Sequence, residues 1–364
     1  MKIDARAEAW ATLQVLGIGP RPLFELLRVF GGPEAVLAGA AAKRRAVVPA
    51  AVARLFDSPA DRARVAATLD WLAGPDRALV AWDDADYPSA LLEIGDPPPV
   101  FFCLGRRELL AQPGFAIVGS RNATPQGAAD AEAFAAALSA AGLAIVSGLA
   151  LGIDAAAHRG GLAQPGSSIA VVGTGLDRVY PARNRALAHD LAARGLLVSE
   201  FAPGTPPLRA NFPRRNRLVS GLARGVLVVE ATLSSGSLIT ARFAGEQGRE
   251  VFALPGSIHS PFSKGCHKLI REGAKLVETA QDILDELNVP RPASAPVEGT
   301  IGPGAAMTAP ERAVAAALGH APSGIDTIVA RTGLPAETIA ATLVGLELAG
   351  RVAAVPGGLW QRRG

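Results

Sequence analysis

The chain has 364 residues, which is enough for two or three domains of ordinary size. It is 49% hydrophobic and 19% charged, a balance that predicts well-filled cores and excludes a disordered polyelectrolyte. The net charge is only +3, so any strongly basic surface must arise from local clustering. We expect a cytoplasmic protein, because the start lacks a signal-peptide core, no apolar run is long enough to cross a membrane, and the two cysteines form no motif.

Residues 1–75 are predicted to form an all-helical domain of the helix-hairpin-helix or SAM-like type. Within it, residues 13–37 read as an apolar helix, a Gly-Ile-Gly-Pro turn and a second apolar helix. In nucleic-acid-binding proteins such a turn directs backbone amides at a phosphate. An ordinary helical hairpin with a glycine cap explains the pattern equally well, and only Arg21 and Arg28 lie nearby. Residues 76–108 are predicted to connect this domain to the next, with a proline-rich stretch at 96–100.

Residues 109–288 alternate short apolar runs with helical stretches. The runs are β-branched and apolar throughout: FAIVGS, LAIVSG, SIAVVG, LLVSE, GVLVVE, EVFALP and AKLVE. Strands that are buried on both faces have this composition, and the helical stretches between them fit right-handed crossovers. The pattern therefore predicts an α/β fold with a Rossmann-like, doubly wound and mostly parallel sheet.

Glycine and hydroxyl residues follow several of these strands, at residues 119–122, 147–148, 173–175 and 234–237. Ligands of doubly wound sheets bind outside the carboxyl ends of the strands, and helix N-termini there attract anions. One such turn serves only to make a tight connection, but four on one edge favour phosphate binding. The first turn lacks the G-x-G-x-x-G pattern and no G-x-x-x-x-G-K-[ST] occurs, so neither an NAD site nor a P-loop is expected.

Residues 208–224 contain five arginines, and no acid occurs between Phe201 and Val229. Arginine forks bind phosphate oxygens, and Phe212, set among these charges, is suited to stack on an unpaired base. The segment therefore favours single-stranded nucleic acid over a merely solvated helix face.

A Pro/Ala/Gly-rich linker is predicted at residues 289–307, before a winged-helix domain at 308–364. Helices are expected over 310–318, 325–332 and 335–349, followed by a hairpin. A winged helix that reads duplex DNA places its third helix in the major groove. Here that helix holds two acids and no base, which favours a protein-contact or regulatory role.

Six motifs in the central part resemble, in order, the DprA/Smf family of bacterial DNA-processing proteins. They are VGSR, SGLALGIDAAAH, GTGLDRVYP, NFPRRNRLVSGL, VVEATLSSGSLITARFAGEQGREVFALPGS and SKGCHKLIREGAKLV. The resemblance implies a non-catalytic recombination mediator that binds and protects single-stranded DNA and loads the RecA recombinase, as in natural transformation. It also implies a homodimer, and contact with RecA, near Ser263–Val277.

The resemblance carries three roles onto single residues. The arginine of the family's GSR turn falls on Arg121, the basic residue before the Phe-Pro pair falls on Arg209, and the base-stacking phenylalanine falls on Phe212. The family usually has lysine where this chain has Arg209, which changes a point donor into a fork. Together with the basic and glycine-serine turns, the predicted DNA-binding set is Gly119, Ser120, Arg121, Asn122, Arg209, Phe212, Arg214, Arg215, Arg217, Ser235, Gly236 and Ser237.

The alternative is a nucleotide-hydrolysing enzyme of the lysine-decarboxylase-like phosphoribohydrolase type. Candidate polar groups near the strand ends are Asp154, His158, Glu200 and Glu230, but the P-G-G-x-G-T-x-x-E type motif of those enzymes is missing. Asp154 and His158 lie four residues apart, a spacing that places them on one helix face, where pairing with each other or with backbone is the simpler interpretation. We expect no catalytic residue, no cofactor and no metal, because histidines and cysteines are scattered.

Overall fold

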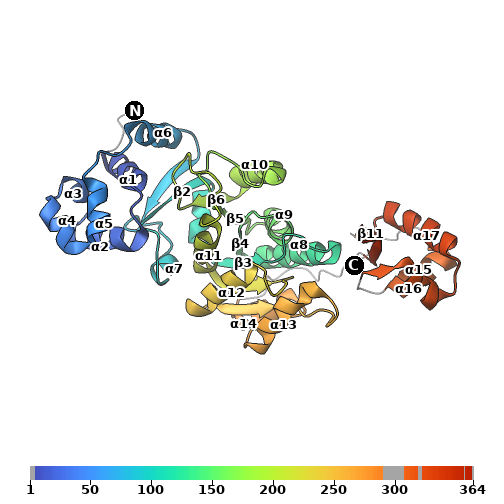
Figure 1. Cartoon of the computed structure of the whole chain (residues 1–364). Coiled ribbons are helices and arrows are strands. Elements are labelled where there is room, and N and C mark those ends of the chain that lie inside the picture. Colours follow the sequence, from blue (N-terminus) through green and yellow to red (C-terminus); the bar gives the residue numbers. More distant parts are fainter. Residues whose placement is uncertain (1–4, 290–306, 319–321, 356, 363–364) are drawn as a thin grey trace.

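The computed structural model describes residues 5–289, 307–318, 322–355 and 357–362 (Figure 1). Helices precede a large central sheet, and a small helical unit with its own sheet follows at the C-terminal end of the sequence. Most of the predicted linker at 289–307 lies outside the described residues. No helix in the described ranges has the length and apolar character that crossing a membrane requires.

The N-terminal part of the chain folds into short helices, as predicted. Their bounds are α1 Ala5–Val15, α2 Pro20–Phe30, α3 Pro33–Ala38, α4 Ala41–Val47, α5 Ala50–Ala53 and α6 Arg62–Leu72. The turn between α1 and α2 contains Gly17 in the left-handed region, at φ 72°, and α2 begins at Pro20, where a missing N–H is harmless. Trp10, Leu13 and Leu26 are fully buried in the core between these helices.

The central sheet has nine strands in the order β1-β2-β6-β5-β4-β3-β7-β8-β9. Their bounds are β1 Arg77–Ala81, β2 Val100–Gly105, β3 Gly114–Val118, β4 Ala144–Ser147, β5 Ser168–Val171, β6 Leu196–Ser199, β7 Ala223–Val228, β8 Glu250–Ala253 and β9 Lys275–Leu276. Strands β3 to β9 are parallel to one another, whereas β1 and β2 are antiparallel additions next to β6. The prediction of a doubly wound, mostly parallel sheet is confirmed.

The segment 76–108 is more than the connection that the sequence suggested. Its strand β2 pairs with β6, Phe102 opposite Ser199, and β1 pairs with β2. The sheet therefore begins at Arg77 instead of near residue 109. The antiparallel direction explains why the crossover pattern did not reveal these strands, since they are joined by a loop and the short helix α7 (Ser89–Leu92).

Two layers of helices cover the sheet. One face carries α8 (Pro125–Ala140), α9 (Ile153–Leu162), α10 (Arg185–Arg194) and α14 (Ala280–Glu286). The opposite face carries α11 (Asn211–Gly221), α12 (Ser237–Glu246) and α13 (Lys264–Arg271). The crossovers change face between β6 and β7, and β7 lies beside β3, so the switch point of the sheet is between β3 and β7. This is the place where doubly wound folds bind ligands.

The C-terminal unit has the predicted order of three helices and a hairpin. It consists of α15 (Ala309–Leu318), β10 (Ser323–Gly324), α16 (Ile325–Thr332), α17 (Ala336–Leu348), β11 (Val352–Val355) and β12 (Leu359–Arg362). Its three strands form a separate sheet in the order β10-β12-β11. A core of its own, including Val314, Ile328 and Leu343, holds the unit together.

Candidate nucleic-acid interface

A cavity of about 740 Å³ lies at the switch point, outside the carboxyl ends of β3 and β4. Its walls are the turn after β3, the turn after β4, one side of α11 and the N-terminus of α12. The structure brings together ten of the twelve predicted residues in this wall: Gly119, Ser120, Arg121, Asn122, Arg209, Phe212, Arg215, Ser235, Gly236 and Ser237. Arg214 and Arg217 are the two that do not line it.

The turn after β3 presents an arginine from a fixed backbone. Ser120 is buried, its amide donates to the carbonyl of Glu230 at 2.7 Å, and its Oγ accepts from the amide of Asn122 at 3.1 Å. Arg121 is exposed, and among the described residues it has no ion-pair or hydrogen-bond partner. The guanidinium is therefore available to an anion in the cavity.

Glu230, two residues after β7, fixes the start of α8. Its carboxylate accepts from the amide of Thr124 at 2.9 Å and from the Thr124 hydroxyl at 2.6 Å, and Thr124 in turn caps α8. Burial raises the pKa of Glu230, and the bonds from Thr124 oppose that rise. Glu230 thus stabilises the N-terminus of α8 through Thr124.

The turn after β4 is held by two buried side chains of α9. Asp154 Oδ2 accepts from the amides of Gly148 at 3.1 Å and Ala150 at 3.3 Å, and His158 Nε2 accepts from the amide of Leu149 at 3.2 Å. Burial raises the pKa of Asp154, against the charge of Arg215 and these amides, and burial lowers the pKa of His158 to about 3. Both residues bond to backbone, in line with the simpler of the two sequence-based interpretations.

Arg215 lies under the cavity and is only 5% exposed. Its Nη1 donates to the carbonyl of Gly148 at 2.6 Å and to the carbonyl of Val171. Burial lowers the pKa of Arg215 to about 10, so the side chain stays charged near neutral pH. A Cβ on Gly148 would lie 2.6 Å from both terminal guanidinium nitrogens and 2.7 Å from Asp154 Oδ2, so only glycine fits between them. Arg215 is therefore a largely buried side chain fixed in the cavity floor, and its place in the predicted DNA-binding set stays a prediction.

The periodicity of α11 separates the arginines of the basic segment. Phe212, Asn216 and Val219 line the cavity, whereas Arg214 and Arg217 lie on another side of the helix. There Glu200 Oε1 accepts from Arg217 at 2.5 Å and forms an ion pair with Arg214 at 3.1 Å.

Arg217 also pairs with Asp96 at 3.3 Å, and its side chain is 6% exposed. The placement of Arg217 in the DNA-binding set is not supported by this geometry. Arg214 pairs with Glu200, but its side chain is still 41% exposed. Fewer arginines of residues 208–224 are therefore free to bind DNA than the sequence suggested, because Glu200, which precedes this segment, pairs with two of them.

Two aromatic rings form the outer wall of the cavity. Phe212 and Tyr180 have ring centroids 5.5 Å apart at an interplanar angle of 40°, and Tyr180 is 48% exposed. Arg209, two residues before α11, is exposed and lines the same cavity. An arginine fork next to exposed ring faces can hold a phosphate and its base together.

The N-terminus of α12 completes the wall. The hydroxyls of Ser235 and Ser237 lie 2.7 Å apart, and Gly236 is the N-cap residue. Asn216 Nδ2 reaches the carbonyl of Gly236 at 3.5 Å and so links α11 to this turn. Exposed amides and hydroxyls at a helix N-terminus favour an anion.

Sequence reasoning missed several lining residues, notably Tyr180, Asn216 and Thr240. Tyr180 is the penultimate residue of the GTGLDRVYP stretch in the loop after β5, so an aromatic in a loop at the carboxyl edge of the sheet was the available signal. Asn216 follows Phe212 by four residues, which places both on one helix face once the start of α11 is known.

Two family descriptions match the chain. DNA recombination-mediator protein A matches residues 78–288, and the DprA winged helix domain matches residues 290–358. The second match confirms the winged-helix prediction for the C-terminal unit.

Individual proteins agree with these matches. Protein Smf of Escherichia coli is 44% identical over 82% of this chain and 80% of its own length. The X-ray structure of DNA processing protein A from Streptococcus pneumoniae is 40% identical, with a TM-score of 0.68 over 79% of this chain and 99% of that one. A structure of DNA processing protein A from Helicobacter pylori, described for its single-stranded DNA binding mode, is 31% identical, with a TM-score of 0.53 over 58% of this chain and 95% of that one.

Proposed function

This chain belongs to the DNA recombination-mediator protein A family, and we propose that it binds single-stranded DNA in the switch-point cavity and delivers it to RecA recombinase. The observation that carries the proposal is the joint wall of Arg121, Arg209 and Phe212 in one open cavity at the carboxyl edge of the sheet. The single-stranded DNA binding described for the H. pylori relative supports it.

Phosphates are proposed to lie between Arg121 and the N-terminus of α12. Arg121 supplies a fork without a protein partner among the described residues, and Ser235 and Gly236 supply hydroxyl and amide donors opposite it. Arg215 adds positive charge from below without leaving its carbonyl partners. Burial raises the pKa of Asp154 at the floor, and the charge of Arg215 beside it opposes that rise.

Bases are proposed to stack on Phe212. Stacking on an aromatic ring needs a base that is not already paired, which favours a single strand over a duplex. Phosphate contacts and stacking make no use of base edges, so the binding is expected to tolerate any sequence.

We place the homodimer contact, and the nearby contact with RecA, at Ser263–Val277. The support is that β9 is the last strand of the sheet in the described residues, so one of its edges has no neighbouring strand. Leu276 on that strand is 47% exposed. An apolar residue on an open edge is suited to pairing with another chain.

No catalytic step is part of this proposal. The acids that the hydrolase alternative needs already have other bonds: Asp154 with the turn after β4, Glu230 with Thr124 and Glu200 with Arg217. Binding of oligothymidylate compared with thymidine monophosphate, together with an assay for base release, separates the two functions.

Arg121→Ala tests the proposed phosphate site. Loss of a charge-assisted contact is expected to weaken oligothymidylate binding by about 1.5–3 kcal/mol, measured by fluorescence anisotropy at moderate salt. The matched control is Arg54→Ala, which removes an exposed arginine from the N-terminal helices and is expected to leave affinity unchanged. Equal affinities of the Arg121 variant and the unmodified chain would remove the turn after β3 from the DNA site.

A further inference from the structure

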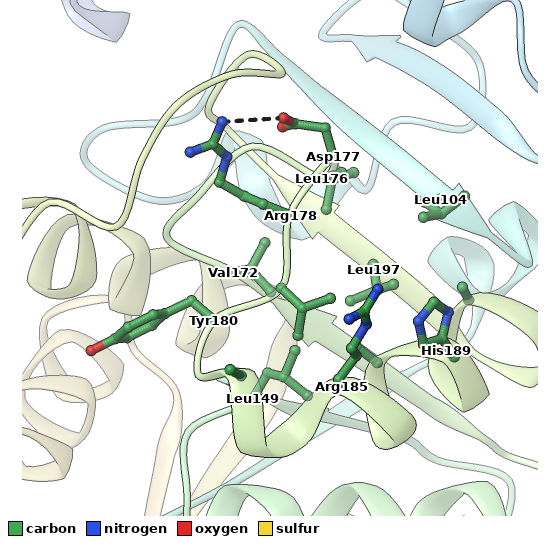
Figure 2. Close-up of a pocket in the computed structure, with 14 residues that line it drawn as sticks. Leu104, Leu149, Val172, Leu176, Asp177, Arg178, Tyr180, Arg185, His189 and Leu197 are labelled. Carbon is green, nitrogen blue, oxygen red and sulfur yellow. Dashed lines mark hydrogen bonds and ion pairs between the residues drawn. The ribbon is translucent and has the colours of Figure 1, made fainter.

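A second cavity of about 380 Å³ shares Tyr180 with the first. Figure 2 shows the residues that line it. It lies between α10 and the loop that follows β5, and Leu149, Val172 and Leu197 form part of an apolar floor. Its volume is in the range of small-molecule sites, roughly 300–1,000 Å³, and is sufficient for one nucleotide.

A guanidinium and an imidazole line one wall of this cavity. Arg185 and His189 are one turn apart on α10, both exposed, and Figure 2 shows the Arg185 guanidinium directed from the helix towards Leu197. Within the described part of the chain, neither side chain has an ion-pair or hydrogen-bond partner. Arg178, by contrast, is held at 3.4 Å by Asp177. An unpartnered guanidinium beside an apolar floor can bind a phosphate while the base covers the floor.

Tyr180 belongs to both cavities. It lies at one end of the second cavity, with His189 at the other, and its ring packs 5.5 Å from Phe212 of the first. A strand leaving the Phe212 ring would therefore meet Tyr180 next and then the wall of α10. Tyr180 is the residue that the two cavity walls share.

We propose that the second cavity is a further nucleotide subsite, in which Arg185 and His189 hold the phosphate of a nucleotide adjoining the one stacked on Phe212. The inference rests on the proposed function, because it assigns the path of the same bound strand. It gives α10 a part in DNA binding, and it sets a minimum strand length below which the subsite stays empty.

The test compares oligothymidylates of increasing length. Arg185→Ala is expected to weaken binding of long strands about tenfold and to lower their salt slope by about 0.7, while the shortest strand that still binds keeps its affinity. Ala182→Trp, which places a large ring at the exposed edge of the cavity, is expected to have the same length-selective effect without a charge change. The control Arg183→Ala removes an exposed charge two residues away that does not line the cavity.

Photocrosslinking from 5-iodouracil gives the position directly. A base placed outside the Phe212 position is expected to crosslink to His189 or Tyr180 in the unmodified protein. If Arg185→Ala and Ala182→Trp bind every length like the unmodified chain, or lose short and long strands equally, the subsite is refuted. An equal loss in Arg183→Ala would also refute it, by showing a general charge effect. If the unmodified chain binds no strand of any length, the proposed function itself fails, which is a distinct result.

Discussion

At the scale of single residues, different side chains of the cavity are suited to stack on bases and to bind phosphates. Phe212 and Tyr180 offer ring faces, whereas Arg121 and Arg209 offer exposed guanidinium groups in the same cavity wall. The two kinds of contact respond differently to salt, because only phosphate neutralisation releases counterions.

Phe212→Ala is expected to weaken single-strand binding by about 1–3 kcal/mol and to leave the salt slope nearly unchanged. Arg209→Gln is expected to lower the slope of log affinity against log salt by about 0.7. Anisotropy titrations over a range of salt concentrations measure both. A slope that changes with Phe212 and not with Arg209 would reverse the two assignments.

The buried His158, which holds the turn after β4, is expected to make the stability of the fold depend on pH. Ser168 Oγ donates to the carbonyl of Ile145 at 2.7 Å, so it accepts from His158 Nδ1, also at 2.7 Å. His158 Nε2 must then accept from the Leu149 amide, and the neutral imidazole has both bonds satisfied. A proton on Nε2 would oppose that amide, and burial together with Arg215 and Arg159 lowers the pKa to about 3.

The unfolded chain therefore binds this proton from about pH 6.5, whereas the folded chain binds it only near pH 3. Stability from neutral His158 is fully present above pH 6.5 and is lost as the pH falls towards 3, by up to about 1.4 kcal/mol per pH unit. Urea unfolding from pH 7.5 to 4.5 is expected to show a shallower pH dependence for His158→Gln than for the unmodified chain. Parallel curves would exclude His158 as a source of acid sensitivity.

At the scale of elements, α11 lines the proposed DNA site with one side and is fixed to the rest of the domain by the other. One side of the helix lines the cavity, and the other is fixed by Arg217 to Glu200, which is 4% exposed, and to Asp96 of the loop before β2. The two ion pairs thus hold α11 to the segment after β6 and to the loop before β2.

Arg217→Met is expected to destabilise the protein by about 3–5 kcal/mol in urea unfolding, because Glu200 stays buried without its closest partner. The salt slope of DNA binding is expected to stay the same. Arg214→Met is the control, since its side chain is 41% exposed and its pair is worth about 1 kcal/mol or less. A second change, Glu200→Leu, is expected to restore part of the stability lost in Arg217→Met. A lowered salt slope in the folded Arg217 variant would return this arginine to the DNA site.

The sequence predicted the parallel strands and the turns at their ends, because buried strands and glycine-serine turns have strong local patterns. It grouped the arginines of residues 208–224 as one surface, because charge along a sequence does not show helical phase. The side of α11 that faces the cavity depends on where the helix begins, at Asn211. It also depends on the ion pair of Arg217 with Glu200, a contact that only the folded chain brings about. The strands β1 and β2 were missed because antiparallel strands carry no crossover signal.

At the scale of the whole molecule, the winged-helix unit is separate from the proposed DNA site. It has its own core and its own sheet, and none of its described residues lines either of the two cavities near Tyr180. Its α17 carries Glu337 and Glu347 and no basic residue.

A chain ending at Val289 is therefore expected to fold and to keep most of its single-strand affinity. The removed part contains six arginines, so a small nonspecific loss from lower charge is consistent with the proposal. Circular dichroism and anisotropy at physiological salt check the two points. A loss of more than about tenfold, or 1.4 kcal/mol, would mean that the winged-helix unit contacts DNA directly.

The antiparallel pair β1 and β2 has a consequence for solubility. Strand β6 is almost wholly apolar, and β2 satisfies the backbone groups on its outer side. A chain that began at residue 109 would keep every residue of the DNA cavity but leave β6 as an open, flat edge. Such an edge recruits strands from other molecules, so that chain would aggregate before its binding could be measured. By covering β6, β1 and β2 are expected to prevent self-association of the sheet, whether or not the N-terminal helices bind a ligand.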